Sequence, residues 1–204
     1  DSIWRGSKQK LIADHPAVNV SWEEANKFCK WLTKKERGEG NITKHDKYRL
    51  PTDAEWSIAV GLEDEFGETP RDRDFANEGN YPWGEEWPPP VDAGNFGGVF
   101  GKWNFSELSK VGSFRPNKKT LYDLGGNAWE WVNDPWIPGS ALRVLRGAWG
   151  PFHARDSTTS TIPERELRRR MQRSLQSSRR FYDTPQNRGA RYGFRVVLEK
   201  KPEK

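Results

Sequence analysis

Oxygen-bearing side chains gather in one short stretch of the chain, residues 121–131, which reads LYDLGGNAWEW. Asp123 and Glu130 supply carboxylates, and the glycines between them allow a tight turn that aims backbone carbonyls inward. Hard cations such as Ca²⁺ bind this mixture of carboxylate and carbonyl oxygens. The alternative is a buried turn with Trp129 and Trp131 packed in the core, because short motifs of this kind have false positives.

The chain has few residues that could bind a soft metal or act as a nucleophile. Cys29 is the one cysteine, so the chain has neither an intrachain disulfide nor a thiolate pair for Cu(I). The histidines, His15, His45 and His153, do not show metal-ligand spacing. The sequence also lacks GxxxxGKS, GxSxG and HExxH motifs. We therefore expect no catalytic residue and no copper.

Two capping signals predict the helices that position these residues. Ser21 and Thr52 are each followed three residues later by a glutamate, the pattern of a capping box. The apolar residues that follow recur at helical spacing and predict helices over 21–37 and 52–60. Cys29 falls on the apolar face of the first helix, where we expect it to be a small core residue.

The rest of the chain reads as loops and short strands. Residues 62–110 show no sustained period and are rich in Gly and Pro, so we expect structured loops there. Strands are expected over 109–114, 143–148 and 192–198. Residues 163–176 predict a basic helix with apolar residues every fourth position.

Composition favours one domain with an aromatic core and an uneven charge. The chain has 204 residues with 11 Trp and 10 Phe, which compensate for a hydrophobic content of only 33%. Residues 151–204 hold 14 Lys and Arg against 6 Asp and Glu, whereas residues 1–150 hold 20 against 23. The basic quarter is either a solvated surface or a contact for nucleic acid, anionic lipid or an acidic partner. No apolar run is long enough to span a bilayer, and the compartment stays open.

Seven motifs in order resemble the sulfatase-modifying-factor family, the formylglycine-generating-enzyme domain. They are HPAVNVSWEEANKFCKWL (15–32), YRLPTDAEW (48–56), YPWG (81–84), VGSFRPN (111–117), LYDLGGNAWEW (121–131), RVLRGAW (143–149) and YGFRVV (192–197). The resemblance implies an α+β domain of the C-type lectin-like fold, with two helices, small twisted sheets and much irregular structure. It also implies one domain over 1–204 that lacks a family segment upstream and carries a basic insertion at about 161–178.

The resemblance implies an activity whose residues are missing here. Oxidase members of the family carry a cysteine pair just after an RGGS-type motif, which binds copper and converts a substrate cysteine to formylglycine. Residues 146–160 read RGAWGPFHARDSTTS and contain no cysteine. Sulfoxide synthases, a second branch, hold iron with three histidines, two of them in an HxxxExH arrangement that is absent here. We expect this chain to lack both reactions.

The resemblance also implies structural calcium. Carried over onto this sequence, the ligands of one family site are Asp123, Gly126, Ala128 and Glu130. A second family site keeps Asn95 and Phe96, but its later element appears only as the shortened GGVFGKW. We therefore predict structural Ca²⁺ at the first site, with the second in question.

These observations favour a non-catalytic domain that binds a protein or an anionic ligand through residues 149–191. Aromatic and arginine side chains are the favoured contact residues of such surfaces. The candidates are Trp149, Phe152, His153, Arg155, Arg179, Arg180, Phe181, Tyr182, Arg188 and Arg191. The alternatives are an oxidoreductase with an altered active site and a nucleic-acid-binding domain that uses the basic helix at 164–176, which lacks the interleaved aromatics that stack on bases.

Overall fold

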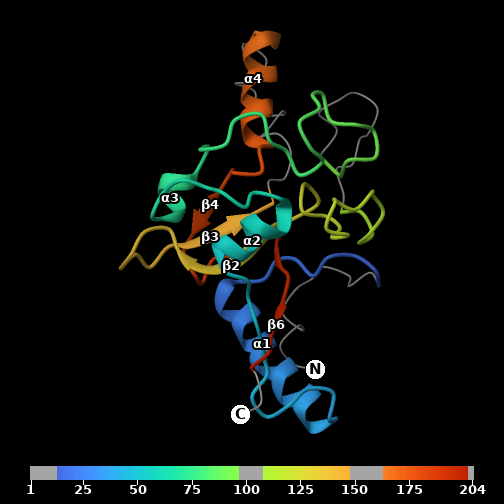
Figure 1. The fold of residues 1–204 in the computed structure, drawn as a ribbon, viewed down its shortest axis with the longest axis vertical. Helices are drawn as coiled ribbons and strands as arrows, with labels where there is room; N and C mark the ends of the chain where they lie inside the picture. The colour runs from blue at the N-terminus through green and yellow to red at the C-terminus, as the bar shows by residue number, and fades with distance from the viewer. Residues whose placement is uncertain (1–12, 97–107, 148–162, 202–204) are drawn as a thin grey trace.

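Helices and two small sheets, joined by long irregular segments, form the part of the chain that the structure describes (Figure 1). The computed structural model describes residues 13–96, 108–147 and 163–201. The helices are α1 (Trp22–Gly38), α2 (Asp53–Val60), α3 (Pro70–Arg73) and α4 (Glu164–Ser174). The strands are β1 (Lys47–Arg49), β2 (Trp129–Pro135), β3 (Arg143–Arg146), β4 (Phe181–Asp183), β5 (Tyr192–Phe194) and β6 (Val197–Glu199).

Capping boxes begin both α1 and α2, as the sequence predicts. The Ser21 hydroxyl accepts the amide of Glu24 at 3.2 Å, and the Glu24 carboxylate accepts the amide of Ser21 at 2.9 Å. Thr52 and Glu55 make the same reciprocal pair at 3.1 and 2.8 Å. α2 ends at Gly61, whose φ of +97° is the left-handed conformation that glycine adopts at helix ends.

The larger sheet has the order β4-β3-β2-β5. β3 pairs antiparallel with β2 and β4, whereas β5 pairs parallel with β2 in the register Trp129 to Tyr192. The smaller sheet pairs β1 with β6 antiparallel. At this pair Arg49 Nε donates to Glu199 at 2.6 Å and links the C-terminal strand to the segment after α1. The irregular register between Trp131 and Pro135 curls the larger sheet.

The core consists of two aromatic-rich clusters that share β2 and β3. Trp131 is fully buried in one cluster, and its Nε1 donates to the backbone oxygen of Val20 at 2.9 Å. Trp22 Nε1 donates to the backbone oxygen of Val132 at 2.9 Å, so the start of α1 is held against β2 from both sides. Trp56 of α2 anchors the second cluster. Indole rings thus provide both apolar area and the hydrogen bonds that fix α1 on the sheet.

The α+β class is confirmed, and both early helices lie where the sequence predicts them. The C-type lectin label and the single-domain boundary stay predictions. The strand expected over 109–114 is wrong, because its amides bond side chains: Ser109 N–H donates to Asn127 Oδ1 and Gly112 N–H to Asp123 Oδ2. Residues 192–198 form β5 and β6, which belong to different sheets.

α4 confirms the predicted basic helix and extends away from the sheets at one end of the long axis of the molecule (Figure 1). Met171 and Leu175 are buried and hold its C-terminal part to the body. Across the described residues, no helix is both long and apolar enough to cross a membrane.

Candidate functional site

The glycine-rich turn at residues 123–130 lies against Asn95. Residues of the two predicted calcium sites are therefore neighbours in the structure. Gly126 has a φ of +81°, and a Cβ there would collide with the backbone of Asn95. The amide of Asn127 donates to the Asn95 carbonyl oxygen at 2.8 Å, and its side chain bonds both backbone groups of Ser109. The turn is therefore a tightly packed joint that only glycine permits at 126.

Both carboxylate oxygens of Glu130 accept hydrogen bonds from other side chains. Arg195 donates from Nε to Oε2 at 2.5 Å and from Nη2 to Oε1 at 2.6 Å, while Trp56 Nε1 donates to Oε2 at 3.0 Å. Arg195 Nη2 also donates to the backbone oxygens of Tyr122 and Asp123 at 3.1 and 3.4 Å. A guanidinium therefore lies where carboxylate and carbonyl oxygens converge.

The remaining predicted calcium ligands are also engaged. Asp123 Oδ2 accepts the amide of Gly112 at 2.7 Å, and the carbonyl oxygen of Gly126 accepts the amide of Ala128 at 2.7 Å. Burial raises the pKa of Asp123, and the charge of Glu130 raises it further, against the opposing Gly112 hydrogen bond. As placed, these residues do not fit a calcium ion bound through Glu130, because its oxygens already pair with a cation. The calcium predicted from the sequence stays untested, and the pairing of Glu130 with Arg195 argues against it.

The aromatic partner of the second predicted calcium site lies in a cluster of rings. Phe96 is buried and meets Trp83 edge-on, with ring centroids 4.9 Å apart. Asn95 is fully buried, and its Nδ2 donates to Ser109 Oγ at 2.9 Å. Both residues therefore have a structural role here, whether or not an ion binds beside them.

The predicted ligand surface is described only in its second half. Trp149, Phe152, His153 and Arg155 lie outside the described residues. Tyr182 is 41% exposed on β4, and the Arg188 side chain is 50% exposed and pairs with Glu24. Phe181 and Arg191 are partly buried, and Phe181 packs against the core.

Arg180 is fully buried, which corrects the expectation that it is displayed on the surface. Its neighbour Arg179 is also largely covered, with a side chain only 14% exposed and Nη1 donating to Asp74 at 2.7 Å. Charge alone gave no sign of this, because arginine is mostly a surface residue. The signal in the sequence is the position of Arg180 between two apolar residues, Leu175 and Phe181, that themselves enter the core.

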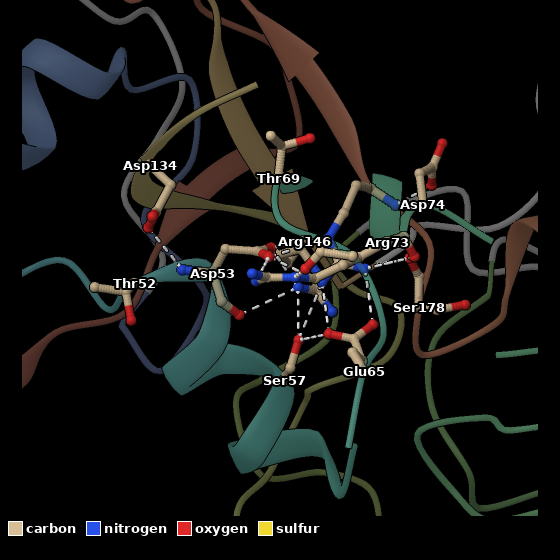
Figure 2. Close-up of polar contacts among 12 residues, drawn as sticks. Thr52, Asp53, Ser57, Glu65, Thr69, Arg73, Asp74, Asp134, Arg146 and Ser178 are labelled. Carbon is tan, nitrogen blue, oxygen red and sulfur yellow. Dashed lines mark hydrogen bonds and ion pairs between the residues drawn. The ribbon is translucent and has the colours of Figure 1, made fainter. Parts of the chain in front are cut away.

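A buried ionic cluster surrounds Arg180, with Arg146 and two carboxylates (Figure 2). Asp53 accepts Arg146 Nη1 on Oδ1 at 2.5 Å and Arg180 Nη2 on Oδ2 at 2.8 Å. Glu65 accepts both terminal nitrogens of Arg180, at 2.6 and 2.9 Å. Ser57 Oγ accepts from both arginines at 3.0 and 3.2 Å and donates to Glu65. Two buried cations therefore face two carboxylates.

The cluster keeps Asp53 and Arg146 charged at neutral pH. Burial is the largest influence on Asp53 and disfavours its charge, but attraction by Arg146 and Arg180 and their hydrogen bonds lower its pKa to about 2. Burial lowers the pKa of Arg146 to about 10, against the attraction of Asp53. Each charge thus depends on its partner, because an unpaired buried charge is costly.

The cluster also holds two distant chain segments together. Arg146 ends β3, whereas Arg180 immediately precedes β4, and the two bind the same Asp53 at the start of α2. Nη2 of Arg146 further donates to the backbone oxygen of Ser177 at 2.9 Å. The end of β3 and the residue before β4 are therefore held at one carboxylate. Sequence reasoning missed this arrangement, although an arginine directly after the apolar pair Val144 and Leu145 of β3 is a signal for it.

A groove of about 970 Å³ lies beside this cluster. Tyr81 and Trp83 stack along it with ring centroids 4.9 Å apart. Arg115, Lys118 and Lys119 bring cations to it, and Lys119 pairs with Glu63 at 2.7 Å. This volume is in the range of ligand pockets, but its charges are mixed.

The thiol and the described histidines do not form a reactive site. Cys29 is buried in α1, and burial raises the pKa of its thiol to about 11, against a backbone hydrogen bond that lowers it. His45 is exposed, and His15 lies in a different segment, before α1. Among the described residues, no group of three or more His, Cys, Asp or Glu could hold a metal ion.

Comparison with known proteins shows the family of this chain. The profile of the sulfatase-modifying factor enzyme 1-like domain matches residues 1–200. The chain is 36% identical over 152 residues to the inactive C-alpha-formylglycine-generating enzyme 2 of Mus musculus, which covers 70% of this chain and 39% of that protein. It is 30% identical over 152 residues to the formylglycine-generating enzyme of Bos taurus, covering 70% and 33%.

The fold is likewise similar to a solved structure, that of PvdO from Pseudomonas aeruginosa. The TM-score is 0.62 at 24% identity, and the alignment covers 94% of this chain and 64% of that one. The chain spans well under half the length of the two curated relatives above.

Proposed function

Because this chain belongs to the sulfatase-modifying factor enzyme 1-like domain family, we propose that it is a non-catalytic member that binds a partner. The observation that supports this most directly is the state of its one thiol. Copper activation by family oxidases needs two thiolates, whereas Cys29 is alone in the sequence, buried in α1, and has a pKa of about 11.

The relatives support the same proposal. The matched mouse protein bears the name of an inactive formylglycine-generating enzyme, so this domain exists without the oxidase activity. The matched bovine protein bears the name of the active enzyme, so family membership alone does not decide between the two. The cysteine count of this chain is what favours the inactive type.

The surface proposed for binding is the exposed part of residues 163–191. This range contains nine arginines and no lysine, against three acidic residues. Arg179 and Arg180 belong to the interior, so the contacts are assigned to α4 and to Tyr182 and Arg188. A surface of this charge favours an anionic partner.

The test of the non-catalytic role is an oxidation assay. The purified chain is incubated with Cu(I), oxygen and a sulfatase-type cysteine peptide, and mass spectrometry follows the peptide thiol. The formylglycine-generating enzyme of Bos taurus serves as the active control. We expect no formylglycine to form from the peptide with this chain. Conversion to formylglycine would overturn the proposal.

A further inference from the structure

Five arginines cover the exposed side of α4. Arg165, Arg168, Arg169, Arg170 and Arg173 are all exposed, and the helix contains no lysine. Met171 and Leu175 occupy the opposite side and are buried. At about 100° per residue, the arginines span an arc of about 200° around the helix axis. Arginines therefore lie on the face of α4 opposite Met171 and Leu175 and on both sides of that face.

Part of this charge is held in place. The guanidinium of Arg173 lies over the ring of Phe75 with its carbon 4.7 Å from the centroid, and Arg179 covers the same ring at 4.5 Å. Glu166 pairs with Arg170 at 2.9 Å and lies 3.8 Å from Arg169, whose side chain is 70% exposed. Stacking and pairing order these side chains before any partner arrives, which lowers the entropic cost of binding.

The width of the arc decides which polyanion fits. An acidic peptide or a membrane surface touches a helix along one side, and insertion into a membrane needs an exposed apolar face. The apolar side of α4 is already buried. A groove with two phosphate-lined walls contacts both sides of a helix at once, and the major groove of DNA, about 12 Å wide, admits one.

We propose that α4 binds the phosphate walls of a double-stranded nucleic acid, without reading its sequence. Arginine suits this role because its planar fork binds phosphate oxygens in pairs. Aromatic platforms, which α4 lacks, serve single strands whose bases are free to stack. α4 stands at one end of the molecule, away from the sheets (Figure 1), and its five arginine side chains are exposed. The proposal rests on the proposed binding function and names the class of partner for it.

The experiment measures binding of the whole chain to a labelled, mixed-sequence DNA duplex by fluorescence anisotropy, between about 50 and 200 mM salt. The variant Arg165→Gln/Arg169→Gln removes two charges from α4 at residues that make no close buried contact. Its matched control, Lys30→Gln/Lys34→Gln, removes two exposed charges from α1, at the opposite end of the molecule (Figure 1). A thermal melt confirms that both variants stay folded.

We expect the logarithm of the affinity to fall linearly with the logarithm of the salt concentration. The α4 variant should reduce the size of that slope by about 1.8, because each lost phosphate contact changes it by about 0.9. The α1 control should leave the slope unchanged. An equal reduction in both variants would show diffuse attraction and overturn the proposal. So would absent binding at low salt, or equal binding of polyglutamate or of the single strand.

The oxidation assay and the duplex assay can overturn their two proposals independently of each other. Conversion of the peptide would overturn the non-catalytic proposal, whatever the duplex result. Loss of duplex binding with the peptide unchanged would overturn only the choice of nucleic acid as partner.

Discussion

At the scale of single residues, Asp53 has the largest predicted effect on stability. It is the carboxylate that Arg146 and Arg180 share, and all three side chains are at least 99% buried. Asp53→Asn removes the charge but keeps the shape, which leaves two buried guanidiniums facing Glu65 alone. We expect a loss of about 3–5 kcal/mol in the free energy of unfolding, measured by denaturant titration.

Asp64→Asn is the matched control for this substitution. Asp64 is exposed and undergoes the same change of side chain, so we expect an effect within about 0.5 kcal/mol. Equal effects of the two substitutions would show that the buried cluster adds nothing to stability.

Asp53 also predicts how stability depends on pH. The folded-state pKa of about 2 is below the usual value of 3.8, so the unfolded chain binds the proton more readily. The contribution is therefore full above about pH 5 and is lost as the pH falls through 4 towards 2. The difference in stability between the wild type and Asp53→Asn should shrink over this window, as chemical unfolding at stepped pH would measure. A difference that stays constant with pH would contradict the charged cluster.

The ion pair between Arg195 and Glu130 leads to a separate prediction about calcium. The Arg195 guanidinium already balances Glu130, so we expect the melting temperature of the wild type to be the same in calcium and in chelator. Arg195→Gln should lower that temperature, because Glu130 loses its buried counter-charge. A clear rise with calcium in the wild type would instead support the site predicted from Asp123, Gly126, Ala128 and Glu130.

At the scale of elements, the two capping boxes predict local helix stability. Ser21→Ala and Thr52→Ala each remove an acceptor for the amide three residues ahead. Each should lower the free energy of unfolding by about 1 kcal/mol, which thermal melts of the single variants can resolve. Ser113→Ala, in an exposed turn, is the control and should change stability little, although its hydroxyl bonds the Lys110 carbonyl oxygen. An unchanged Thr52→Ala would mean that packing of α2 alone fixes its start.

Helices with local signals could be predicted from the sequence, because residues that are close together in the chain form both the cap and the apolar face. The ranges of α1 and α2 follow from both signals, whereas α4, which no side chain caps, follows from the spacing of its apolar residues alone. Strands of three residues such as β1 and β4 could not be, because pairing partners as distant as Lys47 and Glu199 define them. The same reason applies to the candidate site: the burial of Arg180 depends on Asp53, more than a hundred positions away.

At the scale of the whole molecule, the exposed arginines proposed for binding and the buried arginines that stabilise the fold lie in different places. The basic helix α4 lies at one end of the molecule (Figure 1). The buried arginines lie at the end of β3 and directly before β4. A count of basic residues in the last quarter of the sequence does not distinguish exposed arginines from buried ones. Substitutions on α4 should therefore change binding with little effect on the melting temperature, and those at Arg146 or Arg180 should do the reverse. Thermal melts and salt titrations of the same variants check this separation.

The shared carboxylate of Asp53 has a consequence for how this scaffold can vary. Because Arg146 and Arg180 both bind Asp53, the end of β3 and the start of β4 are held to the same residue of α2. A change at Asp53 should therefore alter the ends of both strands at once, so this position tolerates far less variation than the exposed arginines of α4.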